Sequence, residues 1–280
     1  MSKITDIERK LRQNVEILLL YGTLIDCPGI VHGKTGIAIF FLHYARYTNN
    51  KLFEKYASDL IVEIQEQIHV NSPADYESGL AGIGAGIDYL VCNKFLEAGD
   101  HIFDDFDQRI YRATMYDPSQ DFSLYEGLTG YGRYWMMRLR HQESSGRAME
   151  CLFRITVLIE ENLFEIPVNE KSDVFCFLYD LQGMSGFEIC AGLLKQFRVP
   201  LAESFPRLGN SATGDVIRKY QTNQYFNSDL HYNNITLNQI HDMDLVKPPS
   251  ELGLLSGYAG EGMLQLTALD HTNFSWMNLL

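Results

Sequence analysis

The stretch Ser78-Gly79-Leu80-Ala81-Gly82-Ile83-Gly84 decides how the rest of this chain is interpreted. Two glycines three residues apart stand at its centre, and an apolar run follows them. The same Gly-x-x-Gly cassette occurs five times, with first glycines at Gly33, Gly79, Gly127, Gly183 and Gly257. These glycines are 46, 48, 56 and 74 residues apart. A local pattern that returns at such intervals predicts stacked supersecondary units.

An apolar run with helical character follows every cassette, and amphipathic segments lie between these runs. The apolar runs include 37–47, 83–91, 131–139 and 263–269, and they are apolar nearly all round, as in a helix buried on several sides. The amphipathic segments include 51–67, 102–115 and 146–161, with charge on one face. Each unit is therefore predicted to pair an inner buried helix with an outer solvated helix. The short apolar run 174–179 is assigned no strand.

Two explanations for the cassette glycines stay open. Positions without side chains on one face of a helix allow neighbouring backbones to approach closely, and glycine tolerates the turn into the helix. If the inner helices all run in the same direction, their N-termini converge, and their N–H groups and dipoles favour an anionic or strongly polar ligand. The alternative is that the glycines only permit tight helix packing.

The negative net charge of the chain disfavours some classes of partner. The chain has 23 basic and 36 acidic residues, so its net charge is −13, which does not suit a nucleic-acid backbone as a partner. A cationic peptide or a neutral substrate is easier to accommodate. No signal peptide or transmembrane segment is predicted, because the first ten residues are polar and the apolar run 15–21 is short. The cysteines stand at unrelated spacings and are interpreted as reduced thiols of a cytoplasmic protein: Cys27, Cys92, Cys151, Cys176 and Cys190.

One domain is predicted for residues 1–280, because the cassettes extend from Gly33 to Gly260. The pattern weakens at about 195–250, a polar stretch with clusters of Asn and Asp that ends in Pro248-Pro249. The 74-residue interval between the last two cassettes holds either one full unit plus a loop or a unit that has lost its glycines. The segment 195–250 is predicted to be irregular, as functional or mobile loops are.

With its cassettes in register, the chain resembles the lanthionine synthetase C-like (LanC-like) family over about residues 30–270. The closest matches are 78–84 and Leu124-Tyr125-Glu126-Gly127-Leu128-Thr129-Gly130. The resemblance implies an all-α fold, an α/α toroid with inner and outer helices, here built from about five to six helical hairpin repeats. It also implies a part in lanthionine biosynthesis. In that chemistry, cyclase members bind zinc and add a cysteine thiol of a precursor peptide to a dehydrated serine or threonine.

The zinc site of those cyclases is not matched in this sequence. They hold zinc with a Trp-Cys-x-Gly cassette and a Cys-His-Gly cassette, and neither occurs here. Zinc that activates a thiol needs three protein ligands and an open position. The family also has an aspartate where this chain has Ser123 and a histidine where it has Gln182. No cofactor is therefore predicted, and zinc stays possible only through other ligands, such as His231, His241 and a neighbouring carboxylate.

Carboxylates and tyrosines precede most cassettes, and on a toroid they would surround one opening. Such an opening suits a basic peptide, and it also suits a sugar, which stacks on tyrosine and is cleaved by paired carboxylates. The alternative is helix capping, because Asp and Ser are favoured N-caps and acids complement the helix dipole. His32 either transfers a proton or caps its helix. The candidate catalytic residues are Glu126, Asp121 and His32, and the candidate substrate-binding residues are Tyr76, Tyr125 and Asp180.

Three functions stay open, and the sequence does not decide whether the protein is an enzyme. The first is a lanthionine synthetase C-like protein that binds or processes a modified peptide without the usual zinc site. Its partner would be a peptide substrate or a modifying enzyme. The second is a glycosidase-like toroid that uses Glu126 with Asp121 or Asp180 as paired carboxylates. The third is a structural interaction module that uses the concave inner ring.

Overall fold

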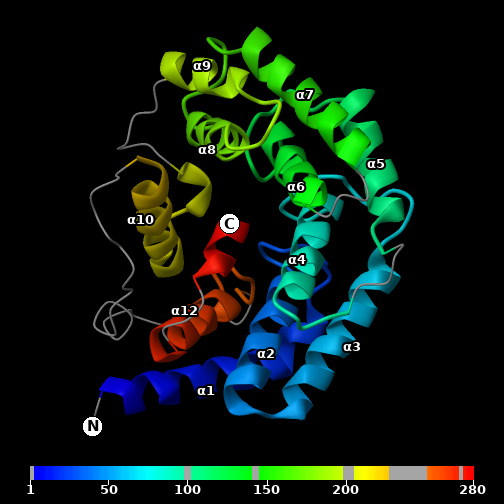
Figure 1. Cartoon of the computed structure of the whole chain (residues 1–280). Coiled ribbons are helices and arrows are strands. Elements are labelled where there is room, and N and C mark those ends of the chain that lie inside the picture. Colours follow the sequence, from blue (N-terminus) through cyan, green and yellow to red (C-terminus); the bar gives the residue numbers. More distant parts are fainter. Residues whose placement is uncertain (1–2, 98–101, 141–144, 198–204, 227–250, 271–273) are drawn as a thin grey trace. The chain divides into compact units, whose positions relative to one another are not determined.

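Helices make up the regular secondary structure of this computed structural model (Figure 1). The structure describes residues 3–97, 102–140, 145–197, 205–226, 251–270 and 274–280. Within these ranges there is no β-strand, which confirms the all-α prediction. The chain divides into two compact units. The first comprises Met1–Ser72, Cys92–Phe95 and Leu208–Leu280, and the second comprises Pro73–Val91 and Leu96–Arg207.

The helices with even numbers start at regular intervals along the chain. They are α2 (Lys34–Thr48), α4 (Leu80–Cys92), α6 (Leu128–Arg140), α8 (Lys171–Leu181), α10 (Ala212–Phe226) and α12 (Tyr258–Asp270). Their starts at residues 34, 80, 128, 171, 212 and 258 are 46, 48, 43, 41 and 46 residues apart. The helices therefore repeat more regularly than the cassette glycines.

The helices with odd numbers alternate with these and are more exposed. They are α1 (Lys3–Tyr21), α3 (Lys51–Gln67), α5 (Asp104–Met115), α7 (Ser145–Glu161) and α9 (Ile189–Gln196), with short 3-10 turns η1 (Gly22–Leu24), η3 (Pro206–Leu208) and η4 (Ser275–Leu279). α2 buries most of its side chains, whereas α3, which packs on it, buries only Ala57, Leu60 and Ile64. The predicted pairing of a buried helix with a half-solvated one is confirmed for these two.

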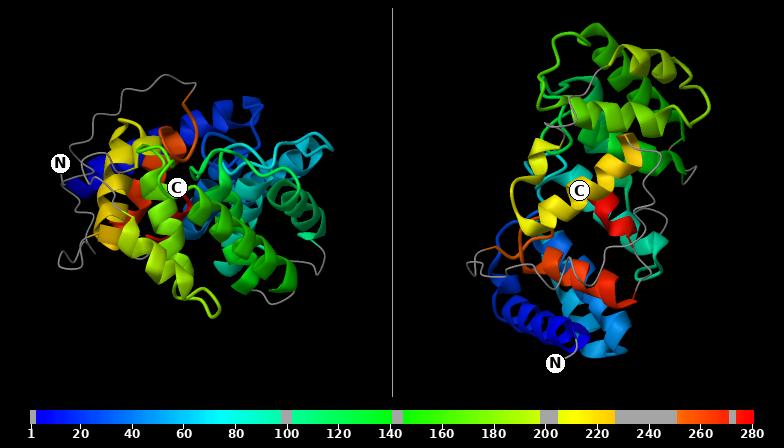
Figure 2. Two further views of the ribbon diagram at one scale, coloured as in Figure 1. Left: turned by 90° about the horizontal axis from the view of Figure 1, so that it is seen from above. Right: turned by 90° about the vertical axis from the view of Figure 1, so that its left-hand side faces the viewer.

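The buried helices lie next to one another within each unit. In the first unit α12 contacts α2 and α10, and in the second unit α6 contacts α8. Three contacts between buried helices share one register, in which a glycine at the fifth helix position faces an aromatic ring at the seventh position of a neighbour. The pairs are Gly84 with Tyr134, Gly132 with Phe177, and Gly262 with Phe40. The N-terminal α1 also packs on α12, so the blue helix and the orange-red helix lie side by side (Figure 2). Closure of the helices into one toroid stays a prediction.

The loop before each of four glycine cassettes folds back beneath the helix that follows. The first N–H group of the helix donates to a carbonyl seven residues earlier, at 2.9 to 3.0 Å, in the pairs Lys34 with Cys27, Leu80 with Pro73, Leu128 with Asp121, and Tyr258 with Glu251. A Cβ on the first glycine would lie less than 3.0 Å from that same carbonyl oxygen. Glycine is therefore required because the helix's own loop passes too close for any side chain.

This geometry corrects the first explanation of the cassettes. The leading glycines make room for the preceding loop rather than for the backbone of a neighbouring helix. The first N–H groups of α2, α4, α6 and α12 already donate to loop carbonyls. The first donor of each of these four helices is therefore used within the protein and is not available to an anionic ligand. The attraction of such a ligand to the helix starts stays a prediction.

The fourth cassette differs from the prediction. Residues 182–187 form the turn between α8 and α9, and no helix begins there. Gly186 has φ 94°, in the left-handed region that favours glycine, and Gly183 has only the carbonyl oxygen of Asp180 nearby, at 3.7 Å. The buried helix of this unit is α8, which begins without glycines. Glu170 and Asp173 stand where the two cassette glycines would be.

Helix α10 occupies 212–226, within the stretch predicted to be irregular. The cassette survives there in part, with Ser211 in place of the first glycine and Gly214 as the second. A Cβ on Gly214 would lie less than 3.0 Å from the carbonyl oxygen of Leu208, as in the glycine cassettes. Polar Thr213 and Gln221 are among its buried residues, so its apolar periodicity is weak. Of the two alternatives for this interval, a unit that has lost its glycines agrees better with the structure than a full unit followed by a loop.

Candidate functional site

Several predicted site residues of the second unit lie on two adjoining loops. Asp121 and Glu126 belong to the loop at 121–127, which precedes α6, and Tyr76 belongs to the loop that precedes α4. The carbonyl oxygen of Tyr125 accepts the N–H groups of Tyr76, at 2.9 Å, and Glu77, at 3.1 Å. The backbone thus holds Tyr76 and Tyr125 together.

The side chains on these loops differ in their access to solvent. Glu126 is exposed and Asp121 is half-buried, so Glu126 is able to meet a ligand directly. Tyr76 is 0% exposed and Tyr125 is 7% exposed, so both rings face protein. Burial raises the pKa of Tyr76 to about 12 and raises the pKa of Tyr125 as well, so both hydroxyls stay protonated at neutral pH.

Asp121 shapes the loop in which it lies. Its Oδ1 accepts the N–H of Ser123 at 2.6 Å, and its carbonyl oxygen accepts the first N–H of α6. Asp75 has a matching position before α4, where its Oδ1 accepts the N–H groups of Ser78 and Gly79 at 2.8 and 3.1 Å. The capping alternative accounts for both carboxylates, since Asp side chains commonly bond backbone N–H groups at turns and helix starts.

Asp180 lies near the end of α8 and pairs with Arg133 of α6. The Arg133 guanidinium donates to Oδ2 of Asp180 at 3.1 Å, and both side chains are partly buried. The neighbouring Tyr179 is 42% exposed. Among the described contacts, Asp180 is therefore linked to the second unit's helices rather than to Glu126.

Two buried carboxylates at the start of α8, one just before the helix and one in its first turn, hold the loop at 121–127, and the sequence did not point to either. Oε2 of Glu170 accepts the N–H of Phe122 at 2.8 Å, and Oδ2 of Asp173 accepts the N–H of Leu124 at 2.9 Å. Burial raises the pKa of both carboxyl groups. The regular helix spacing is the signal that could have found them, because a search one period beyond Gly127 reaches residues 170–173.

Arg207 of η3 pairs with the Oδ1 of Asp173. Both side chains are buried, and the guanidinium opposes the effect of burial on the pKa of Asp173. The same guanidinium lies 5.8 Å from the centre of the Tyr125 ring. Nearby, Cys176 is 3% exposed and burial raises its pKa well above the usual range, so it is an unreactive thiol.

His32 lies in the first unit, whereas Asp121 and Glu126 lie in the second. Its side chain is exposed, and its backbone would lie less than 3.0 Å from a Cβ on Gly253. The close packing of Gly253 shows that the loop before α12 touches the loop before α2 through its backbone at this point. The neighbouring Lys34 is buried and pairs with Glu63 at 2.6 Å.

No group of three His, Cys, Asp or Glu residues within the described ranges is placed to hold a metal ion. His231 and His241, the alternative zinc ligands that the sequence leaves open, lie in 227–250, outside the described residues. The described residues therefore do not fit the zinc of the cyclases.

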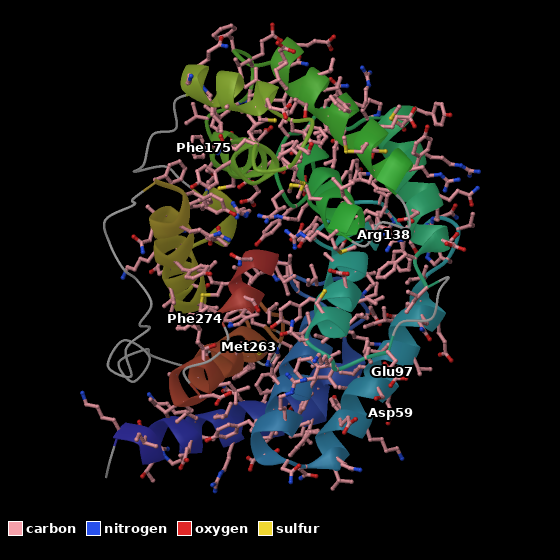
Figure 3. All side chains as sticks on the ribbon, viewed as in Figure 1. Asp59, Glu97, Arg138, Phe175, Met263 and Phe274 are labelled. Atoms are coloured by element: carbon pink, nitrogen blue, oxygen red, sulfur yellow. The ribbon has the colours of Figure 1, made fainter. Side chains whose placement is uncertain are left out.

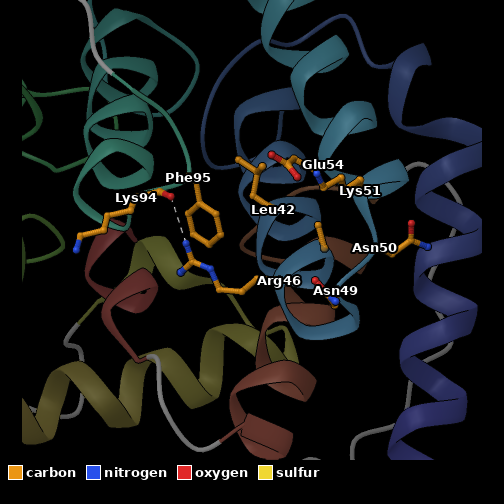
Figure 4. Close-up of a pocket in the computed structure, with 9 residues that line it drawn as sticks. Leu42, Arg46, Asn49, Asn50, Lys51, Glu54, Lys94 and Phe95 are labelled. Carbon is orange, nitrogen blue, oxygen red and sulfur yellow. Dashed lines mark hydrogen bonds between the residues drawn. The ribbon is translucent and has the colours of Figure 1, made fainter.

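A hollow of about 230 Å³ opens in the first unit between the end of α2 and the start of α3 (Figure 4). The Arg46 guanidinium lies 3.6 Å from the centre of the Phe95 ring and donates to the carbonyl oxygen of Asn93 at 2.7 Å. Oδ1 of Asn50 caps α3 by accepting the N–H of Leu52 at 3.0 Å. The polar groups of Arg46 and Asn50 are thus bonded within the protein. The loops before α4 and α6 are the better candidate site, because Glu126 there is exposed.

A scan against protein-family models and a search of curated proteins found no match to this chain. In the ranges that the structure describes, the chain has the fold of an all-helical protein with regularly spaced buried helices. In the part of the chain that the structure describes, no helix is both long and apolar enough to span a bilayer.

Proposed function

We propose that this protein is a lanthionine synthetase C-like α/α toroid that binds a modified peptide during lanthionine-type peptide maturation, without the usual zinc cyclase site. The observation that supports the proposal is the repeat. Buried helices start every 41 to 48 residues. Four of them follow a glycine-containing loop whose own carbonyl group accepts the first N–H of the helix. The resemblance to the family implies such a repeat. In a closed toroid these loops would meet at one opening.

The chemistry of the loops favours a basic peptide as the ligand. Glu126 is exposed and Glu77 is half-buried, on a chain whose net charge is −13. Opposite charge speeds the association of a cationic peptide and contributes to specificity, and salt weakens this attraction. Binding of a peptide does not need the cyclase zinc ligands, which this sequence lacks.

Fluorescence anisotropy with labelled synthetic peptides tests the proposal. The probes are a basic synthetic peptide that contains serine, threonine and cysteine and any precursor peptide encoded beside the gene, each in the unmodified form and with its serines and threonines dehydrated. We expect at least one to bind with a Kd of about 1 to 100 μM, typical of a transient partner. Binding should weaken as salt is raised from about 50 to about 500 mM.

A matched pair of variants locates the binding surface. Glu126→Gln should weaken binding about three- to tenfold, because one exposed charge that faces the peptide is lost. Glu160→Gln changes another exposed glutamate, on α7, and should leave the Kd unaltered. The proposal fails if none of the peptides binds at about 1 mM, or if both variants weaken binding equally.

The carbohydrate alternative has less support from the described contacts. Asp121 bonds the backbone of its own loop, and Asp180 pairs with Arg133, so neither is described as a partner of Glu126. Hydrolysis of an oligosaccharide that Glu126→Gln abolishes would nevertheless favour this alternative over peptide binding.

A further inference from the structure

Loops of neighbouring buried helices are joined by the same backbone hydrogen bonds in both units. The carbonyl oxygen of Tyr125 accepts the N–H groups of Tyr76 and Glu77, as described above. The carbonyl oxygen of Val31 accepts those of Leu254 and Leu255, at 2.8 and 3.2 Å. Each acceptor lies two residues before the first glycine of its own cassette. Each pair of donors lies three and two residues before the neighbour's first glycine.

Helix α8 makes the equivalent link with side chains. Leu124 lies three residues before Gly127, as Tyr76 lies three before Gly79, but its N–H donates to Oδ2 of Asp173 at 2.9 Å. Glu170 accepts the N–H of Phe122 at 2.8 Å. The segment before α8 forms local turns instead of a cassette loop, with Glu170 N–H donating to Pro167 and Lys171 N–H to Val168. Carboxylates thus take the place of the backbone carbonyl.

This replacement puts a negative charge in the interior, where it needs a counter-charge. The side chains of Asp173 and Arg207 are 2% and 8% exposed and form an ion pair. A buried ion that loses its partner is strongly destabilising, so the two residues depend on each other. The loop that carries Tyr125 and Glu126 is therefore held by an acceptor whose charge Arg207 balances, while the other described loop links use neutral backbone groups.

We propose that Asp173, paired with Arg207, is a positioning residue that fixes the Tyr125–Glu126 segment and so sets where the exposed Glu126 carboxylate meets a ligand. Asp173 acts through the N–H of Leu124, two residues from Glu126, and does not itself touch the ligand. Only the consequence for the ligand rests on the proposed function, because the anchoring of the loop is measurable without any ligand.

Hydrogen–deuterium exchange and peptide anisotropy, measured on the full chain, test the proposal. Asp173→Ala removes the acceptor and should speed exchange in the peptide covering 121–127 by about tenfold. The increase at 121–127 should clearly exceed the increase in α7, which measures the overall destabilisation that the unpaired Arg207 causes, and the Kd for the peptides described above should rise about tenfold. Equal increases at 121–127 and in α7 would instead show a loss of global stability alone.

A double variant separates positioning from charge and keeps the test valid if Asp173→Ala fails to fold. Asp173→Asn with Arg207→Gln removes both charges, while the asparagine amide oxygen still accepts the Leu124 N–H. We expect exchange at 121–127 and the Kd to stay within about threefold of the parent protein. The exposed pair Asp215 and Arg218, changed to Asn and Gln, serves as the control and should alter neither readout.

Two results would overturn the positioning role. One is unchanged exchange at 121–127 in a folded Asp173→Ala protein. The other is a double variant with an intact loop that binds as weakly as Asp173→Ala, which would mean that charge acts on the ligand directly. If the parent protein binds no peptide but Asp173→Ala loosens the loop as described, the positioning of the segment stands and the proposed function fails.

Discussion

Gly262 in α12 lies against the ring of Phe40 in α2, so that a Cβ at position 262 would come within 3.0 Å of that ring. Figure 3 labels the adjacent Met263 on α12. Gly132 in α6 and Phe177 in α8 repeat the relationship in the second unit. In each pair the aromatic ring fills the space that the glycine leaves open, so the two residues are coupled.

Gly262→Ala should therefore lower the free energy of unfolding by about 1 to 3 kcal/mol, because the added methyl group overpacks the contact with Phe40. The same change combined with Phe40→Leu should cost less than the sum of the single changes, since the leucine relieves the clash. Urea denaturation measures all three. Gly192→Ala is the control, because no neighbour lies within 4 Å of its added Cβ in α9, and it should stabilise by up to about 1 kcal/mol.

The two kinds of Gly-x-x-Gly sequence should respond differently to the same substitution. Gly127→Ala drives a Cβ into the carbonyl oxygen of Asp121, so it should cost about 1 to 3 kcal/mol and disturb the loop before α6. Gly183→Ala has only a contact of 3.7 Å and should cost less than about 0.5 kcal/mol. Equal thermal midpoints for the two variants would contradict the distinction between the true cassettes and the turn at 182–187.

The buried pair of Asp107 and Arg138 should be among the strongest single contacts of the second unit. Arg138, labelled in Figure 3, donates to both carboxylate oxygens at 2.9 and 3.0 Å, and the Tyr134 hydroxyl donates to Oδ1 at 2.6 Å. Both ion-pair side chains are 4% exposed. Arg138→Met should cost about 3 to 5 kcal/mol, because it leaves the carboxylate buried without its counter-charge.

Two further variants check that interpretation of Arg138. Adding Asp107→Asn to Arg138→Met removes the unpaired charge and keeps an acceptor for Tyr134, so it should recover part of the loss. Arg218→Met breaks an exposed pair with Asp215 and should change the free energy of unfolding by less than about 1 kcal/mol. A similar cost for Arg138→Met and Arg218→Met in urea denaturation would refute the argument from burial.

His43 should make the stability of the protein fall in mild acid. Burial, followed by the nearby Arg46, lowers the pKa of His43 to about 4, with Asp270 acting in the opposite direction. The unfolded chain, with a pKa near 6.5, takes up this proton first as the pH falls. The contribution of neutral His43 is therefore complete above pH 6.5 and is lost as the pH falls towards 4, by roughly 3 kcal/mol in total.

Urea denaturation at about pH 7 and about pH 4.5 measures the effect of His43. His43→Gln should reduce the difference in unfolding free energy between the two pH values, because the substituted side chain does not titrate. A parent-like pH dependence in His43→Gln would show that other groups cause it.

The sequence predicted the helix starts at which close packing of the backbone requires glycine. α2, α4, α6 and α12 begin at cassette glycines, because a side chain there would collide with the preceding loop. α8 begins beside Glu170 and Asp173, which hold their neighbour through side chains and leave no glycine to find. α10 retains Gly214 alone and buries polar residues, so its signal is too weak to stand out.

The candidate site was predictable to a smaller extent. Glu126 could be singled out because it lies within a cassette, and Asp121 because it lies shortly before one. The pairing of Asp173 with Arg207 joins residues 34 positions apart, and it depends on how η3 returns to α8. No local sequence pattern predicts that η3 packs back against α8. The residues that hold the loop could therefore be identified only from the structure.

The contact between α2 and α12 also dictates an order of events during protein synthesis. Phe40 and Gly262 are 222 positions apart, so the ribosome makes the partner of α2 long after α2 itself. At about 5 to 20 residues per second, that delay is roughly 10 to 40 s. The second unit, nearly continuous from Pro73 to Arg207, is completely translated within this interval. The nascent chain therefore carries an uncovered aromatic surface on α2 while it is being translated, and a chaperone that holds this surface would protect the chain until its last helices emerge.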